Sequence, residues 1–194
     1  MNHETPREQP PQPTNEDIER YKREKREELN GAFEEILSSG SPLFFRGSWA
    51  GELLSGVPSE HWDIDFYIDN NELGKFNEFL VSHGFKIEKS DGKFLITKGR
   101  ALFDCHPWRE EGDYFVGEGP HGTFYFPKEG FITIETESGP VNIMSPELMW
   151  IMKKGGPNLD SKRKANLDKL EGFLNTDKLK IISDKFKFIP PSDN

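Results

Sequence analysis

The chain has 194 residues, of which 34 are acidic and 25 basic, so its formal net charge is −9. This length allows one domain with a substantial core, and the acidic balance argues against nucleic acid as a partner, because phosphate binding needs a basic surface. A single cysteine, Cys105, excludes an internal disulfide and is typical of the reducing cytoplasm. With no apolar run long enough to cross a bilayer and no secretion signal at the N-terminus, we expect a cytoplasmic protein without a membrane partner.

The first half of the chain predicts alternating helices and strands. Residues 1–15 are rich in Pro, Gln and Glu and have no hydrophobic pattern, which predicts a disordered tail. Residues 16–40 predict a helix, because a charged first half leads into an apolar stripe. The next segments predict, in order, a buried strand (PLFFRG), a helix (SWAGELLSG), a strand (DIDFYID) and a helix (NNELGKFNEFLVSHG).

From Phe85 onward the hydrophobic period changes to two, which is typical of strands. FKIEKS, KFLITKG and ALFDCHP predict three strands, the first two joined by a hairpin turn at Asp91-Gly92. REEGDYFVGEGPHG predicts an acidic loop, which is either simply solvated or a binding surface for a cationic acceptor, and TFYFP, FITIETESG and PVNI predict further strands. SPELMWIMKK and SKRKANLDKLEGFL then predict helices, and a weaker helical segment completes the chain.

This order of elements predicts an α/β (α+β) fold, in which a mixed β-sheet is flanked by helices. We expect the main domain over residues 41–175, including a helical C-terminal part. A C-terminal helix and tail are expected over residues 176–194.

Three aspartates fall close together in HWDIDFYID. Side chains of a strand alternate between its two faces, so Asp63, Asp65 and Asp69 are expected on one side and the apolar residues between them on the other. Like charges at this spacing repel unless a cation lies among them. Asp104, in ALFDCHP, is a further carboxylate at the end of another predicted strand. Taken singly, these residues are explained by an acidic solvent face and a turn. Together they favour a site for a hard divalent cation such as Mg²⁺.

Gly47 and Ser48 lie where a predicted strand meets a predicted helix. Glycine allows a ligand to approach the backbone closely, and the free amides at a helix start favour phosphate groups. Gly-Ser turns of this kind are common, so Gly47 and Ser48 indicate a phosphate site only in combination with the aspartates. A nucleotide triphosphate at this turn, together with Mg²⁺, would neutralise the stacked carboxylates.

Several segments, in a fixed order, resemble a known family. They include FFRGSWAGELLSG, HWDIDFYID, LFDCHPW, GTFYFPKEGF, SGPVNIMSPELM and SKRKANLDKL, and they cover roughly residues 43–175. The series is similar to the nucleotidyltransferases of the DNA polymerase β superfamily. It resembles in particular the small aminoglycoside 2″-adenylyltransferase and lincosamide nucleotidyltransferase group.

The resemblance implies a Mg²⁺-dependent nucleotidyltransferase with a nucleotide, in most cases ATP, as co-substrate. Such an enzyme moves a nucleoside monophosphate to a hydroxyl and releases pyrophosphate. By this resemblance Asp63 and Asp65 would bind Mg²⁺, and Asp104 would be a metal ligand or a general base. Catalysis would then consist mainly of positioning and charge neutralisation.

The resemblance also implies contacts to the nucleotide phosphates. Gly47 and Ser48 would supply them at the turn, and Lys162 would reach a phosphate from the C-terminal part. The family carries Thr-Arg or Ser-Arg before the His of its His-x-Asp-x-Asp segment, whereas Ser59-Glu60 stand there in this chain. Arg46 is the expected substitute for that arginine.

The acceptor is expected to be a small hydroxylated molecule, with aminoglycoside and lincosamide antibiotics as candidates. A catalytically silent nucleotide-binding regulatory module and an enzyme that nucleotidylates a protein hydroxyl are the alternatives, and retention of three aspartates argues against the silent module. His106 is not expected to bind zinc, because no second Cys/His pair occurs at ligand spacing. Lys153 and Lys154 are expected only to complement a helix C-terminus.

Overall fold

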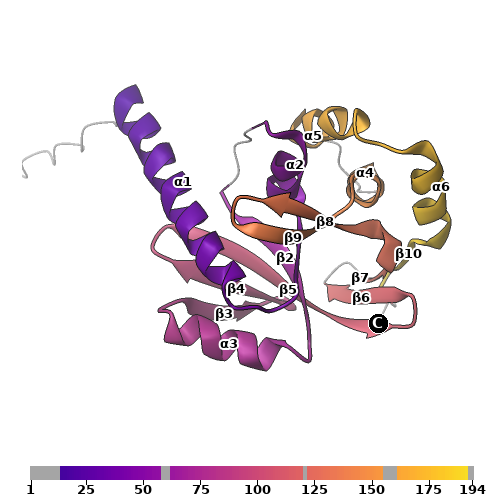
Figure 1. Ribbon diagram of the computed structural model, residues 1–194, viewed down its shortest axis with the longest axis horizontal. Coiled ribbons are helices and arrows are strands. Elements are labelled where there is room, and N and C mark those ends of the chain that lie inside the picture. The colour runs from indigo at the N-terminus through magenta and orange to yellow at the C-terminus, as the bar shows by residue number, and fades with distance from the viewer. Residues whose placement is uncertain (1–13, 58–61, 120–121, 155–160, 192–194) are drawn as a thin grey trace, which may run out of the picture.

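A computed structural model describes residues 14–57, 62–119, 122–154 and 161–191 (Figure 1). Most of the predicted N-terminal tail, residues 1–13, lies outside the described residues, and so does Ser59-Glu60. Within the described residues there are six α-helices: α1 (Asn15–Leu37), α2 (Gly47–Ser55), α3 (Leu73–Ser82), α4 (Pro146–Lys154), α5 (Ser161–Glu171) and α6 (Thr176–Lys185). No helix of this part of the chain is long and apolar enough to cross a membrane.

The strands form one mixed sheet of ten strands. They are β1 (Leu43–Arg46), β2 (Ile64–Asp69), β3 (Lys86–Ser90), β4 (Lys93–Lys98), β5 (Ala101–Glu111), β6 (Tyr114–Gly119), β7 (Gly122–Pro127), β8 (Phe131–Thr136), β9 (Gly139–Met144) and β10 (Lys187–Ile189). A 3₁₀ turn, Lys128–Gly130, joins β7 to β8. The order across the sheet is β10-β7-β6-β5-β2-β1-β9-β8, and β4, which pairs with β3, also pairs with β5. The pairs β2–β5 and β1–β9 are parallel, and the others are antiparallel. The predicted mixed sheet flanked by helices is therefore confirmed.

Alternation along β2 and β5 separates the core from the polar side chains. Ile64, Phe66 and Ile68 of β2 are fully buried, as are Phe103 and Cys105 of β5. They belong to one hydrophobic cluster, to which α1 contributes four buried residues and α3 two. Burying these side chains is the main stabilising term for this face, and it forces the residues between them onto the opposite face. The alternate positions carry the acidic side chains.

Helix α1 is tied by charge to two segments that carry candidate site residues. Arg26 forms an ion pair with Glu52 of α2. Arg100, in the turn between β4 and β5, pairs with Glu24 and Glu28 of α1, each at 2.9 Å. Figure 1 shows α1 crossing the fold beside the β4–β5 region, with its N-terminal end projecting beyond the body. The helix therefore links the start of β5 to α2.

The predicted acidic loop over residues 109–122 is wrong, because most of it forms a hairpin of β5 and β6. Phe115 and Val116 are buried against the sheet, and Gly112 turns the chain with a φ of +59°. Basic side chains pair with two of the acidic side chains. Arg109 contacts Glu118 at 2.6 Å, and Lys128 contacts Glu110 at 2.6 Å. Burial of Phe115 and Val116 thus stabilises a segment whose sequence predicts a loop, and the exposed ion pairs add little to it.

The end of the chain also differs from the prediction of a helix and tail. Residues 176–185 form α6, but residues 187–189 pair with β7 as the edge strand β10. A Cβ atom at Gly122 would lie 2.2 Å from the carbonyl oxygen of Ile189, so only glycine allows this close approach. A three-residue strand has too little hydrophobic pattern to be recognised without its partner.

Candidate active site

The turn from β1 into α2 brings the backbone close to a carboxylate. Gly47, the first residue of α2, has a φ of +78°, a conformation that favours glycine. A Cβ atom at this position would lie 2.7 Å from Oδ2 of Asp65. Glycine is therefore required both by the backbone and by the approach of Asp65. The start of α2, with Ser48 as its second residue, therefore lies beside Asp65.

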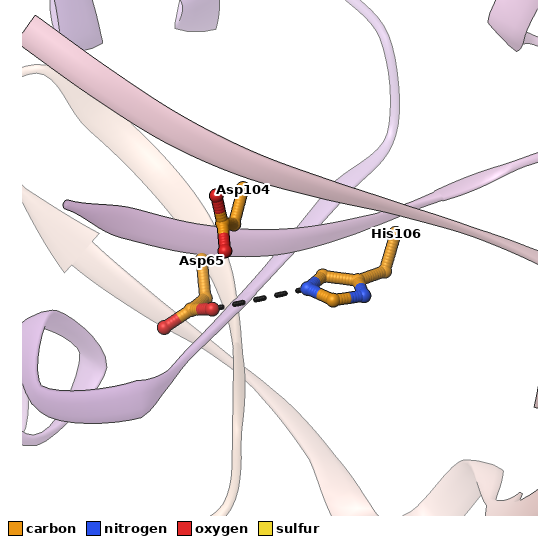
Figure 2. A group of neighbouring side chains, drawn as sticks. All are labelled: Asp65, Asp104 and His106. Atoms are coloured by element: carbon orange, nitrogen blue, oxygen red, sulfur yellow. Dashed lines mark ion pairs between the residues drawn. The ribbon is translucent and has the colours of Figure 1, made fainter. Parts of the chain in front are cut away.

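Asp65 and Asp104 lie side by side because β2 and β5 are parallel neighbours. Their Cα atoms are partners in the register, and Tyr67 faces His106 two residues further along. A carboxylate oxygen of Asp65, one of Asp104 and a ring nitrogen of His106 all lie within 4.8 Å of one another. Figure 2 shows the imidazole of His106 pointing toward the carboxylate of Asp65, with Asp104 on the adjacent strand. All three side chains are partly buried.

Arg46, the last residue of β1, supplies a positive charge to this group. Its guanidinium donates a hydrogen bond to Oη of Tyr67 at 2.9 Å and lies 3.4 Å from Oδ1 of Asp65. It also lies 3.2 Å from Nε2 of His106. The same Nε2 atom of His106 lies 3.9 Å from Oδ1 of Asp65. Arg46 thus bridges three side chains of the site, and its expected contact with a phosphate stays a prediction.

The charges around Asp65 favour its ionised form. Burial alone would raise the pKa of Asp65, but the neighbouring His106 and Arg46 outweigh it and hold the pKa below the usual range. Burial lowers the pKa of His106, and the nearby Asp65 offsets this only in part. At neutral pH the site therefore holds an ionised aspartate beside a neutral imidazole.

We expect His106 to make the fold less stable as the pH falls from 7 to 5. The unfolded chain takes up a proton at the ordinary histidine pKa of about 6.5, whereas the folded chain, with its lowered pKa, takes it up only at more acidic pH. Asp65, with its lowered pKa, titrates below this window. Urea unfolding of His106→Gln should show a flatter dependence of the unfolding free energy on pH than the wild type.

The matched control for this experiment is His83→Gln, which removes a histidine from the exposed end of α3. Equal slopes for the wild type and His106→Gln between pH 7 and pH 5 would contradict the neutral, buried imidazole.

A second cation contacts Asp104. Lys93, the first residue of β4, forms an ion pair with Oδ2 of Asp104. Leu95 faces Asp104 in the antiparallel register of β4 and β5, so Lys93 lies two residues from the pairing position. The side chain of Asp104 is 13% exposed and that of Lys93 30%. Both carboxylates of the pair thus have a protein cation as neighbour.

The predicted acidic trio is only partly assembled as expected. Asp65 and Asp104 meet, but the group that forms in the described residues includes His106 and not Asp63. Asp63 lies immediately before β2, is partly buried and has an interaction of its own. The sequence excludes a zinc site at His106 because no second Cys/His pair follows it, yet His106 groups with two carboxylates, Asp104 on its own strand and Asp65 on the neighbouring strand. The spacing of Asp104 and His106, two residues apart on one strand, was the available signal.

A shallow, open recess lies between α2, α4 and α5, next to this group. Gly47 and Ser48 line one end of it, so the recess and the carboxylates share the start of α2. Its remaining lining residues are Gly51, Glu52, Ser55, Val57, Met149, Lys153, Lys169, Leu170 and Phe173. Two lysines and several apolar side chains thus face one space. The sequence predicts only that Lys153 complements a helix C-terminus, and it gives no functional prediction for Lys169. The side chain of Lys162 lies outside the part of α5 that is described.

The donor set fits a divalent cation. Carboxylate oxygens such as those of Asp65 and Asp104 are the ligands that Mg²⁺ and Mn²⁺ prefer. An ion of this kind would offset the repulsion between two neighbouring carboxylates. The residues present are therefore suited to hold the metal that the resemblance implies.

Comparison with solved structures shows a shared fold. ANT(2″)-Ia in complex with adenylyl-2″-tobramycin matches with a TM-score of 0.60 and 21% identity, over 79% of this chain and 94% of that chain. The lincomycin-bound lincosamide antibiotic adenylyltransferase LnuA matches with a TM-score of 0.62 and 19% identity, over 76% and 97% of the two chains. An antigenic nucleotidyltransferase-like protein from Paracoccidioides brasiliensis matches with a TM-score of 0.51 and 12% identity, over 82% and 85%. At these identities the likeness establishes the fold alone.

Comparison at the level of sequence identifies the family. A search of curated proteins gives no match. The family model for aminoglycoside-2″-adenylyltransferase, in contrast, matches residues 28–170, which is well over half of the chain. The match begins within α1 and ends within α5, so it spans the start of α2, the acidic pair and every lining residue of the recess except Phe173. The resemblance seen in the sequence is thus confirmed, and the chain belongs to the aminoglycoside-2″-adenylyltransferase family of nucleotidyltransferases.

Proposed function

We propose that this protein transfers AMP from ATP to a hydroxyl of a small molecule in a Mg²⁺-dependent reaction. The observation that carries the proposal is the meeting of Asp65 and Asp104 beside Gly47 at the start of α2. Two carboxylates and a helix start are the parts that a metal–nucleotide complex needs. Family membership supports the adenylyl group as the unit transferred. A relative of the same fold holding adenylyl-2″-tobramycin supports an aminoglycoside hydroxyl as acceptor.

The recess between α2, α4 and α5 is the proposed binding site of the nucleotide. Gly47 and Ser48 line the recess and form the N-terminal end of α2, where free backbone amides favour phosphate groups. Lys153 and Lys169 supply positive charge for the phosphates. Phe173, which is 45% exposed, and its apolar neighbours offer a surface for the base. The triphosphate would then extend toward Asp65.

In the proposed reaction Asp65 and Asp104 would hold the ion, together with Asp63, which the resemblance implies as a third ligand. When bound, a divalent ion neutralises phosphate charge and orients the nucleotide for in-line attack. The acceptor hydroxyl oxygen forms a bond to the α-phosphorus, and the bond from that phosphorus to the β-phosphate oxygen breaks, releasing pyrophosphate. Asp104 accepts the proton of the hydroxyl. The neighbouring His106 and Arg46 lower the pKa of Asp65 and so keep it ionised.

The proposal is tested by incubating the protein with α-labelled ATP, Mg²⁺ and a panel of aminoglycosides and lincosamides. We expect an acceptor whose mass rises by one AMP unit, together with stoichiometric pyrophosphate. Binding of ATP without pyrophosphate release would favour the silent regulatory module. Label transferred to added protein substrates, and to no small molecule, would favour the protein-modifying alternative.

Lys153→Met and Lys169→Met should each raise the KM for ATP by about tenfold with little change in kcat. A hydrogen bond between a charged group and a phosphate contributes on the order of 1.5–3 kcal/mol, and loss of such a contact weakens ground-state and transition-state binding alike. Steady-state kinetics with varied ATP measures the effect.

The control for the lysine variants is Lys154→Met. It removes the same charge from the neighbouring position of α4, where the ammonium lies 4.2 Å from the ring centroid of Trp150. An unchanged KM for both recess variants would place the nucleotide elsewhere.

A further inference from the structure

The two carboxylates of the candidate site are held by cations of different kinds. Arg46, which contacts Asp65, is fixed by further contacts with Tyr67 and His106 on β2 and β5. Its planar guanidinium is thus part of a network that spans three strands. Removing it from Asp65 would break several hydrogen bonds at once. Arg46 is therefore a permanent neighbour of Asp65.

Lys93, which contacts Asp104, is attached quite differently. It is the first residue of β4 and follows the tight turn at Asp91 and Gly92, whose φ angles are +46° and +79°. Its ion pair with Oδ2 of Asp104 is made by an ammonium on a flexible four-carbon chain. The side chain of Lys93 is 30% exposed, so its ammonium can rotate toward the solvent while β4 stays folded. This cation can be displaced.

We propose that Lys93 competes with the divalent ion for Asp104. In the metal-free protein its ammonium neutralises the carboxylate, and it gives way when the ion binds. This inference rests on the proposed function, because it takes Asp104 as a ligand of the ion. A single positive charge and a double one within a few ångströms of one carboxylate repel each other, so Lys93 lowers the affinity of the empty site for the metal.

The competition has a consequence for the order of binding. A nucleotide brings its own negative phosphates, which offset the positive charge of Lys93 near the site. The ion is then favoured as part of a metal–nucleotide complex over the ion alone. Lys93 is therefore a positioning residue: it neutralises Asp104 until the metal–nucleotide complex binds.

The test is a titration of the protein with Mn²⁺ in the absence of nucleotide, with free Mn²⁺ measured by electron paramagnetic resonance. Mn²⁺ takes the same carboxylate ligands as Mg²⁺ and is visible in this measurement. We expect Lys93→Met to bind Mn²⁺ at least roughly fivefold more tightly than the wild type, since two charges about 4 Å apart interact appreciably near a protein surface.

Two matched variants separate the ion pair from other effects. Lys89→Met removes an exposed lysine of the same hairpin, at a position that faces Phe94. Lys93→Arg keeps a cation opposite Asp104. Both should bind Mn²⁺ within about twofold of the wild type, because neither removes the charge that faces the carboxylate.

The inference is overturned if Lys93→Met binds Mn²⁺ no more tightly than Lys89→Met, or if Lys93→Arg binds it as tightly as Lys93→Met. In either case the proposed function is untouched, provided that the wild type binds the ion. Absence of Mn²⁺ binding in every variant would instead remove both the metal site and the competition. Thermal unfolding of each variant verifies that it is folded.

Discussion

Asp104→Asn should lower kcat by about 10³-fold or more while leaving the protein folded. Asparagine keeps the size of the side chain but removes the charge that binds a divalent ion and the site that accepts a proton. Each function contributes several kcal/mol to lowering the barrier, and 1.36 kcal/mol corresponds to a factor of ten in rate. The partner Lys93 can turn into water, so no buried charge is left unpaired. Single-turnover release of pyrophosphate from ATP, with an accepted acceptor, measures the loss.

Asp69→Asn is the matched control for this variant. Asp69 is an aspartate at the far end of β2, four residues after Asp65, and its carboxylate accepts a hydrogen bond from the backbone amide of Asn71 at 2.7 Å. An asparagine oxygen can accept the same bond, so activity should stay within about twofold of the wild type. Full activity in Asp104→Asn would contradict a mechanism in which Asp104 binds the ion and accepts the proton, whatever the acceptor.

Gly47→Ala should reduce kcat/KM by about 100-fold. The new methyl group would lie 2.7 Å from Oδ2 of Asp65, so the carboxylate must move. Asp65 is held on its other side by Arg46 and His106, and a displacement of about 1 Å at a reacting centre can cost on the order of 100-fold in rate. The positive φ of +78° adds strain of about 1–2 kcal/mol in the free energy of unfolding. Steady-state kinetics and urea unfolding measure the two effects separately.

Gly40→Ala separates backbone strain from the contact with Asp65. Gly40 has a similar φ of +69°, but a Cβ atom there would meet no other atom within 4 Å. This variant should lose about 1–2 kcal/mol of stability and keep its activity. If Gly47→Ala were no less active than Gly40→Ala, the close approach of α2 to Asp65 would have no catalytic role.

Local patterns in the chain were sufficient to predict the pieces of the site. The alternation in HWDIDFYID and ALFDCHP is a property of a single strand, so it correctly separates Ile64, Phe66 and Phe103 from Asp65 and Asp104. The Gly-Ser pair at a strand-to-helix boundary is equally local, and Gly47 does begin α2. The order of these motifs along the chain was also enough to indicate the family, because it does not depend on contacts between them.

Contacts between distant segments could not be predicted in the same way. The register that places Asp65 opposite Asp104 joins two strands separated in sequence by α3 and the β3–β4 hairpin. It is set by burial of apolar residues across the whole sheet, and the same packing brings His106 to Asp65. The hairpin over residues 109–122 was missed for a related reason. Two of its acidic side chains pair with Arg109 and with Lys128 of another segment.

The sequence by itself therefore determined the family, the fold class and the chemical character of the carboxylates, since each of these follows from local order and residue type. Only the tertiary structure decided which side chains complete the group: His106 and Arg46 beside Asp65, and Lys93 beside Asp104. It also decided that Lys153 and Lys169 share one recess with Gly47. The physical reason is that ion pairs and close packing depend on which strands and helices become neighbours, and that choice is made by burial over the entire domain.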